Sequence, residues 1–177
     1  MTGGTMTGWL SGTFGRLLLT AVILAAVGAS AQAATVVALG ASNTYGKGVA
    51  RNEAYPAQLQ AILKARGINV RVVNAGINGD TTEGMLRRVD RAAPKGTDVV
   101  ILQPGGNDRR RGDATNRSGN IEEIRTRLSA RGTKVIVMEN NAFRGLPHQS
   151  DGQHLTPEGY RMLAESFASE VARALGK

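Results

Sequence analysis

Short apolar runs alternate with amphipathic stretches from residue 35 onward, and this alternation restricts the possible folds more than any other feature of the chain. The apolar runs are rich in β-branched residues and cover residues 35–39, 70–73, 98–102 and 134–138. The stretches between and after them carry apolar side chains at helical spacing, over residues 55–66, 80–93, 121–131 and 156–175. Strands and helices that alternate in this way form a parallel sheet covered by helices. We therefore predict an α/β fold, a three-layer α/β/α sandwich with a short parallel sheet of about four strands.

The first 33 residues have the pattern of a secretory signal peptide. Arg16 is their one charged residue, and it precedes an apolar run, residues 17–27, that is about 11 residues long where a membrane span needs roughly 20. Small-residue cleavage sites follow within residues 29–33. We expect residues 1–33 to be removed, which leaves one domain over residues 34–177 in the periplasm or outside the cell. An uncleaved membrane anchor is the alternative.

The composition excludes some chemistry and some partners. The chain has no cysteine, which rules out disulfides, a thiol nucleophile and cysteine metal ligands. The net charge of +8 falls to +7 once Arg16 is removed with the signal, and this favours anionic surfaces such as lipid headgroups or wall polymers. Nucleic acid is not expected as a partner, because the arginines are spread out and aromatic residues, at 4%, are too few to stack on bases.

Polar residues follow the predicted strands at the edge where sheets of this kind bind ligands. Ser42 follows the first strand in a glycine-led turn, which can expose its hydroxyl. Gly79 precedes a helix start after the second strand, so its N–H group can face an anion. Asn107 follows two glycines after the third strand, and its amide is a donor that can steady a developing oxyanion. Each position also fits an ordinary turn, and both interpretations stay open at this point.

The turn at Ser42 differs from two common patterns. Thr44 stands where the nucleophile elbow of α/β-hydrolases has glycine. Lys47 is followed by Gly48, where a phosphate-binding loop has Ser or Thr. The sequence therefore predicts neither an elbow of that kind nor a phosphate loop.

The chain has two histidines, and one of them has an acidic partner nearby in sequence. Asp151 lies three residues before His154, just ahead of a predicted helix start. At that spacing the carboxylate can accept a hydrogen bond from the ring and leave the other ring nitrogen free to act as a base. Metal binding is less favoured, because no second cluster of ligands accompanies the pair. His148 has no such acid and is interpreted as a loop residue near the substrate.

Taken in order, four sequence blocks resemble the SGNH (GDSL-like) hydrolases, in particular their thioesterase/lysophospholipase branch. The blocks are residues 40–44, 74–82, 105–108 and 151–156, and the first has Ala41 where the family usually has Asp. The resemblance runs from residue 35 to about residue 175 and implies a flavodoxin-like sheet.

The resemblance also implies roles for the matching positions. Ser42 would be the nucleophile, His154 its base and Asp151 the residue that orients the imidazole. The oxyanion hole would comprise the N–H groups of Ser42 and Gly79 and the amide of Asn107. The expected reaction needs no metal and no organic cofactor, and its substrate would be a small acyl ester or a lipid.

The sequence departs from this family between Met138 and Asp151, where 12 residues leave no room for the helix and fifth strand of typical members. We expect a four-stranded sheet and a direct loop that forms one wall of the site. Arg109 begins an arginine run, residues 109–111, that either attracts a phosphate or carboxylate headgroup at the rim or is a solvated charge run. Arg109 and His148 are therefore the candidates for substrate contact.

These observations predict a secreted, monomeric serine hydrolase that acts as an esterase, lysophospholipase or acyl thioesterase. One alternative keeps the catalytic residues and changes the substrate to O-acetylated carbohydrate of cell-wall glycans. Another is a non-catalytic, basic periplasmic binding protein that uses the same fold.

Overall fold

The structure is a computed structural model that describes residues 1–4 and 32–177. Most of the predicted signal peptide, residues 5–31, lies outside the described residues, so its prediction is untested. No helix within the described ranges is long and apolar enough to cross a membrane.

The domain alternates strands and helices as the sequence predicts. In chain order its elements are β1 (Ala34–Gly40), α1 (Ser42–Tyr45), α2 (Tyr55–Ala65), β2 (Val70–Gly76), α3 (Thr82–Ala92), β3 (Val99–Gln103), α4 (Asn107–Arg110), the 3₁₀ turn η1 (Ala114–Asn116), α5 (Arg117–Ser129), β4 (Lys134–Val137), the 3₁₀ turn η2 (Asn140–Phe143) and α6 (Pro157–Ala174). The four strands form one parallel sheet in the order β2-β1-β3-β4. The chain thus leaves β1 first to one side and then to the other, and the two sides diverge between β1 and β3. Ligands bind at the carboxyl ends of strands at such a point.

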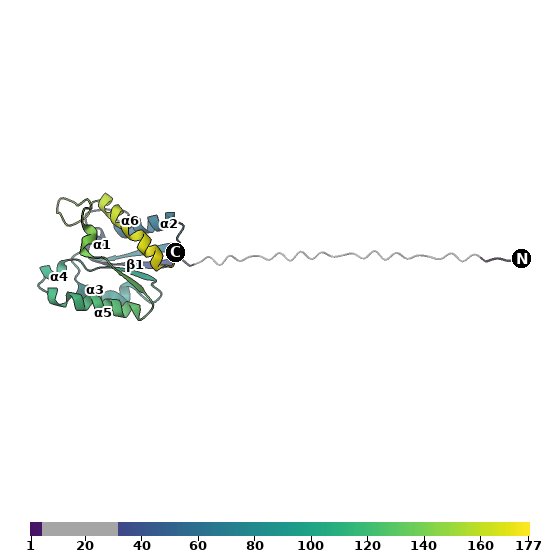
Figure 1. Cartoon of the computed structure of the whole chain (residues 1–177), viewed down its shortest axis with the longest axis horizontal. Coiled ribbons are helices and arrows are strands. Elements are labelled where there is room, and N and C mark those ends of the chain that lie inside the picture. Colours follow the sequence, from purple (N-terminus) through teal and green to yellow (C-terminus); the bar gives the residue numbers. More distant parts are fainter. Residues whose placement is uncertain (5–31) are drawn as a thin grey trace. The chain divides into compact units, whose positions relative to one another are not determined.

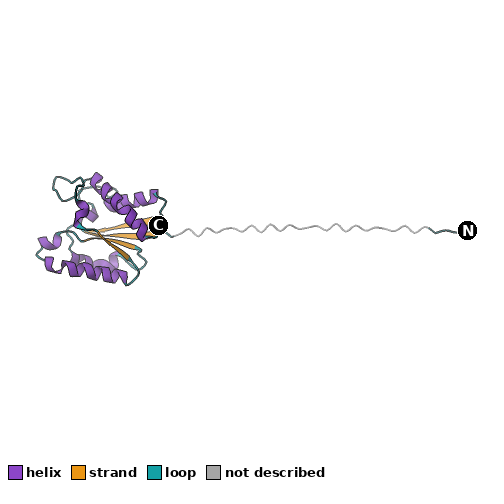
Figure 2. Ribbon diagram, in the orientation of Figure 1, coloured by secondary structure: helices purple, strands orange, loops and turns teal. Residues whose placement is uncertain are grey.

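Alternate side chains of β1 point to opposite faces of the sheet and belong to two separate cores. Val36 and Ala38 pack with the buried face of α2 and α6, whereas Val37 and Leu39 pack with that of α3 and α5. All four side chains are at most 1% exposed. Figure 1 shows α2 and α6 on one side of β1 and α3 and α5 on the other, and Figure 2 shows the strands between the two helical layers. The predicted three-layer α/β/α sandwich is confirmed.

The ends of the elements and two short helices differ from the predicted pattern. The second predicted helix begins at Thr82 rather than residue 80, because the Thr81 hydroxyl accepts the N–H of Gly84 and caps α3. Helices α1 and α4, each four residues long, replace turns that the sequence pattern left without structure. The segment between Met138 and Asp151 has no fifth strand, as expected, but it contains η2 rather than being a plain loop.

Candidate active site

Ser42 is the first residue of α1, directly beyond the carboxyl end of β1. The turn that presents it is held by Gln103 at the end of β3, whose side-chain Oε1 accepts the N–H of Ala41 and the hydroxyl of Thr44, each at 3.1 Å. A Cβ at Gly40 would collide with the Thr44 side chain, so the tight turn requires glycine at residue 40. Gln103 is 4% exposed and was missed by the sequence analysis, although a polar residue at the end of a fully buried strand marks such a position.

His154 contacts Ser42 across 112 residues of sequence. Its Nε2 lies 2.8 Å from Ser42 Oγ, and its Nδ1 lies 2.5 Å from Asp151 Oδ2. The loop that carries the ring is fixed on both sides, because His148 forms a β-bridge with Leu155 and Thr156 caps α6 through the N–H of Gly159. The three residues predicted as a triad therefore form one continuous chain of hydrogen bonds.

Asp151 is held in its ionised form. The hydrogen bond with the His154 ring, followed by those from the N–H groups of His154 and Gln153, lowers the pKa of Asp151 well below its usual range. A carboxylate accepts hydrogen bonds and donates none, so Nδ1 of His154 carries the proton toward Asp151. The lone pair of Nε2 is then available to accept the hydroxyl hydrogen of Ser42.

The expected oxyanion donors surround the same hydroxyl. Ser42, Gly79 and Asn107 line one cavity of about 480 Å³ together with Asp151 and His154. Asn107 is 8% exposed, and its Nδ2 donates one hydrogen bond of 2.8 Å to the carbonyl of Asp80. Because an amide NH₂ has two hydrogens, one remains available for a ligand in the cavity.

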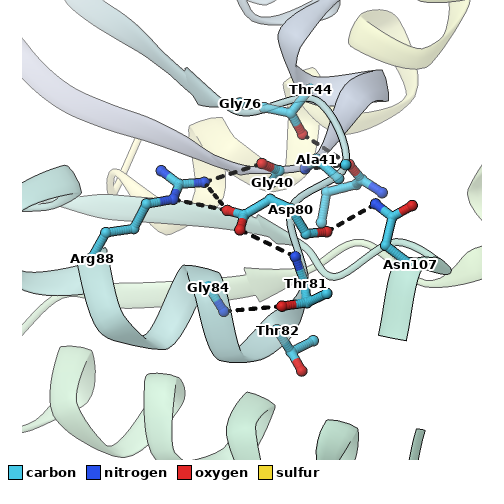
Figure 3. A network of polar contacts seen from close by, with 12 residues as sticks. Gly40, Ala41, Thr44, Gly76, Asp80, Thr81, Thr82, Gly84, Arg88 and Asn107 are labelled. Atoms are coloured by element: carbon cyan, nitrogen blue, oxygen red, sulfur yellow. Dashed lines mark hydrogen bonds and ion pairs between the residues drawn. The ribbon is translucent and has the colours of Figure 1, made fainter. Parts of the chain in front are cut away.

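A largely buried ion pair holds the loop before α3 against β1. Arg88 contacts the Asp80 carboxylate through Nε at 2.8 Å and Nη2 at 2.7 Å, and both side chains are 11% exposed. Arg88 Nη2 also donates to the carbonyl of Gly40 at 3.2 Å. Figure 3 shows Arg88 reaching from α3 to both partners, with Asn107 on the other side of Asp80. We refer to Arg88, Asp80 and their bonds to Gly40 and Asn107 as the Arg88 clamp.

The sequence analysis missed the Arg88 clamp because Asp80 was interpreted as part of a helix start. The available signal was a charge on an apolar helix face, since Arg88 lies three residues after the buried Met85 and directly before the buried Val89. A charged side chain in that position needs a partner when it is buried.

The structure separates the arginine run into three different environments. Arg109 is exposed and lines neither of the two cavities that meet at Ser42 and His154. Arg110 lines both, with Nη1 donating to Asn107 Oδ1 at 3.2 Å and Nη2 donating to Gln153 Oε1. Arg111 donates to the carbonyl of Gly79 at 2.9 Å. The cavity residue in this run is therefore Arg110 rather than the predicted Arg109.

His148 lies at the other predicted position, on the edge of the second cavity. This cavity has a volume of about 260 Å³ and also touches Phe143 of η2. The ring Nδ1 of His148 is 2.7 Å from the carbonyl of Leu146. Within residues 1–4 and 32–177, no group of three or more His, Cys, Asp or Glu side chains is placed to hold a metal ion.

With this geometry established, comparison with known proteins assigns the family. A model described as the GDSL-like Lipase/Acylhydrolase family matches residues 38–172. The chain belongs to this family. The family resemblance identified from the four sequence blocks is confirmed.

Two curated relatives of this GDSL-like chain are similar over most of its length. Esterase TesA of Pseudomonas aeruginosa is 35% identical over 127 residues, which cover 70% of this chain and 63% of TesA. An arylesterase of Vibrio mimicus is 29% identical over 125 residues, which cover 69% of this chain and 62% of the relative. The chain therefore spans somewhat less than two thirds of the length of these relatives.

Solved structures of GDSL-like and related proteins have the same fold. A crystal structure of TesA has a TM-score of 0.69 at 24% identity and covers 79% of this chain and 99% of its own. AlinE4, an SGNH-hydrolase family esterase, has a TM-score of 0.56 at 26% identity, with coverages of 80% and 79%. The Clostridium thermocellum family 3 carbohydrate esterase has a TM-score of 0.61 at 18% identity, with coverages of 82% and 100%, and shows the fold alone.

The departure of this GDSL-like chain from the usual first block has a structural setting. Ala41 is 2% exposed and belongs to the apolar cluster on the α3 and α5 face of the sheet. A carboxylate there would be buried, and burying an unpaired charge is costly. The methyl group avoids this cost while the backbone N–H keeps its bond to Gln103.

Proposed function

We propose that this protein is a secreted serine esterase that cleaves small acyl esters with Ser42, His154 and Asp151. The observation that carries the proposal is the hydrogen-bonded chain from Ser42 Oγ to His154 Nε2 at 2.8 Å and from His154 Nδ1 to Asp151 at 2.5 Å. A hydroxyl, a base and an orienting carboxylate in this order activate a serine for attack on a carbonyl carbon.

The reaction proceeds in two halves. In the first, Ser42 Oγ attacks the ester carbonyl while His154 Nε2 takes its proton, and His154 then returns that proton to the departing alcohol. In the second, water attacks the acyl group on Ser42, with His154 first accepting the proton of the water and then giving it to Ser42 Oγ. The acid is released and the hydroxyl is restored.

Negative charge develops on the carbonyl oxygen in both halves. The donors proposed to receive it are the N–H groups of Ser42 and Gly79 and the free N–H of Asn107, which border the same cavity. Each such donor typically stabilises the transition state by about 3–4 kcal/mol. The Arg88 clamp supports this arrangement, because Asp80 fixes one hydrogen of Asn107 and leaves the second directed elsewhere.

The proposal is tested by labelling the intact protein with a fluorophosphonate probe and by following the hydrolysis of p-nitrophenyl acetate. We expect labelling and hydrolysis by the wild type and neither by Ser42→Ala, because only the activated hydroxyl attacks phosphorus or carbon. Ser118→Ala on the first turn of α5 is the matched control and should behave as the wild type. Wild type and Ser42→Ala that are equally unreactive would favour the binding-protein alternative.

A short acyl group fits the cavities best. Among the described residues that line the 260 Å³ cavity, Phe143 is the one large apolar side chain, and polar side chains line much of the rest: Asn43, Gln103, Asn107, Arg110, His148 and Gln153. Long acyl chains need an apolar channel, whereas an acetyl group on a carbohydrate does not. This lining favours acetate esters, including O-acetylated glycans, as the second candidate substrate class. Rates on p-nitrophenyl esters from acetate to decanoate should therefore fall steeply after the shortest chains, and a rise toward decanoate would support a lipid substrate instead.

A further inference from the structure

Arg110 and Lys47 give the space beside Ser42 a positive charge that no neighbouring acid neutralises. Both residues line the 480 Å³ cavity, and Arg110 also lines the 260 Å³ cavity on the other side of Ser42. Asp151 is the acid that borders the larger cavity, and its carboxylate is already bound to His154. In the part of the chain that the structure describes, neither Arg110 nor Lys47 forms an ion pair with a carboxylate.

The guanidinium of Arg110 is held in place by neutral partners. It donates to Asn107 Oδ1 and to Gln153 Oε1, and the main-chain carbonyl of Gln153 in turn accepts the Asn43 amide at 3.1 Å. Two of its five N–H groups are used by these partners, which leaves three for a ligand. A guanidinium that is fixed in this way, and whose charge is uncompensated, is suited to a carboxylate or a phosphate oxygen.

We propose that the protein prefers esters that carry a carboxylate or phosphate group close to the reacting carbonyl, and that Arg110 binds this group with help from Lys47. This inference rests on the proposed esterase function and names a substrate class for it. The anionic group would lie in the 480 Å³ cavity, which both cations border, while the acyl carbonyl lies at Ser42 between the two cavities.

The test compares two substrates that differ in charge and little in shape, 3-acetoxybenzoate and 3-acetoxybenzamide. The measured quantity is the ratio of their kcat/KM values in the wild type and in variants, so that the difference in intrinsic reactivity of the two esters cancels between proteins. Arg110→Gln should lower the ratio by about five- to tenfold, as expected for a charge-assisted hydrogen bond at a solvent-screened site, and Lys47→Gln by about twofold. Added salt should lower the wild-type ratio toward that of Arg110→Gln.

Arg109→Gln is the matched control, because it removes the same charge from the neighbouring exposed residue outside both cavities. It should leave the ratio unchanged. An equal fall for both substrates in Arg110→Gln would overturn the inference, since Arg110 would then act only through Asn107. An equal change of the ratio in Arg109→Gln would also overturn it, because the effect would come from the general charge of the surface.

A binding measurement separates this inference from the proposed function. The Ser42→Ala protein is titrated with 3-hydroxybenzoate and 3-hydroxybenzamide by NMR, where turnover plays no part. Tighter binding of the anion, lost in Ser42→Ala/Arg110→Gln, supports the anion site even if no ester is hydrolysed, and equal binding of the two compounds overturns it even if esters are hydrolysed. Co-sedimentation with anionic phospholipid vesicles identifies the source: Arg110-dependent sedimentation assigns the anion to a lipid headgroup, and a charge-dependent ratio without sedimentation assigns it to a soluble ester.

Discussion

The contact between Asp151 and His154 determines which nitrogen of the imidazole faces Ser42. The acid lowers its own proton affinity through this bond and so keeps the Nδ1 proton between the two side chains. Asp151→Asn should therefore reduce kcat by about 10³–10⁴-fold, because an amide placed to donate to Nδ1 favours the tautomer with the proton on Nε2. KM on p-nitrophenyl acetate should change little. The variant should keep the melting temperature of the wild type within a few degrees, and retention of most of the wild-type kcat would contradict the proposed role of Asp151.

Tyr160 gives a second prediction at the scale of one residue, in the dependence of stability on pH. Its side chain is fully buried and its hydroxyl donates to Asn43 Oδ1 at 3.0 Å. Burial raises the pKa of Tyr160 to about 12, above the value near 10 of an exposed tyrosine. The folded state then holds this proton more tightly than the unfolded state, so the stabilisation is complete below about pH 10 and is lost as the pH rises toward 12.

Tyr160→Phe should consequently cost about 1 kcal/mol in the free energy of unfolding at pH 8, and less as the pH rises above 10. The measurement is urea unfolding of both proteins at several pH values between 8 and 12, in which the titration of all other groups cancels in the difference. A difference between the two proteins that stays constant over this range would show that the tyrosine does not titrate in the folded state as described.

At the scale of the elements, the Arg88 clamp joins β1, the loop after β2, and α4. Arg88→Met leaves the Asp80 carboxylate nearly buried without its partner, and such a loss typically costs about 3–5 kcal/mol. Arg87→Met is the matched control, because Arg87 pairs with Glu83 on the exposed face of the same helix, where an ion pair is worth less than about 1 kcal/mol. Chemical denaturation measures both changes, and equal destabilisation by the two variants would contradict the clamp.

The clamp also predicts an effect on the chemistry. In Arg88→Met the carbonyl of Asp80 is less well fixed, and with it the amide of Asn107. The rate of fluorophosphonate labelling should fall by about tenfold or more at a temperature where the variant is fully folded, since misplacing one oxyanion donor weakens transition-state stabilisation. The double variant Asp80→Asn/Arg88→Met should recover part of the stability without recovering the labelling rate.

The elements of the fold were predictable where their own pattern is strong, and unpredictable where tertiary contacts decide. The strands and the long helices carry apolar residues at their characteristic spacing, and all of them were placed within a few residues. Helices α1 and α4 are four residues long, too short for a periodic signal, and the first depends on Gln103, which is about 60 residues away in sequence. Local spacing likewise indicated Asp151 and His154 as a pair, whereas the contact of Arg88 with Gly40 spans 48 residues and left no local pattern.

For the whole molecule, the two apolar cores and the site set the extent of the folded domain. Every residue of both cores lies between Ala34 and Leu175, and all the proposed catalytic residues lie within the same range. The sheet begins at the first residue of that range, because Ala34 pairs with Val70 and its N–H donates to the carbonyl of Asn69 at 3.0 Å. A cut between Ala33 and Ala34 would therefore leave β1 intact.

This position predicts how the chain is processed if it is secreted. Expressed with its own N-terminus in a Gram-negative host, the protein should appear in the periplasm with a mature N-terminus at Gln32 or Ala34, according to which of the two Ala-x-Ala sites is cut. Intact mass spectrometry of the periplasmic protein distinguishes the two products. Replacing Ala31 and Ala33 with Asp should block cleavage and retain the precursor, because signal cleavage needs small residues at these positions. A protein found only with residues 1–33 attached and in the membrane fraction would identify the N-terminal segment as an anchor.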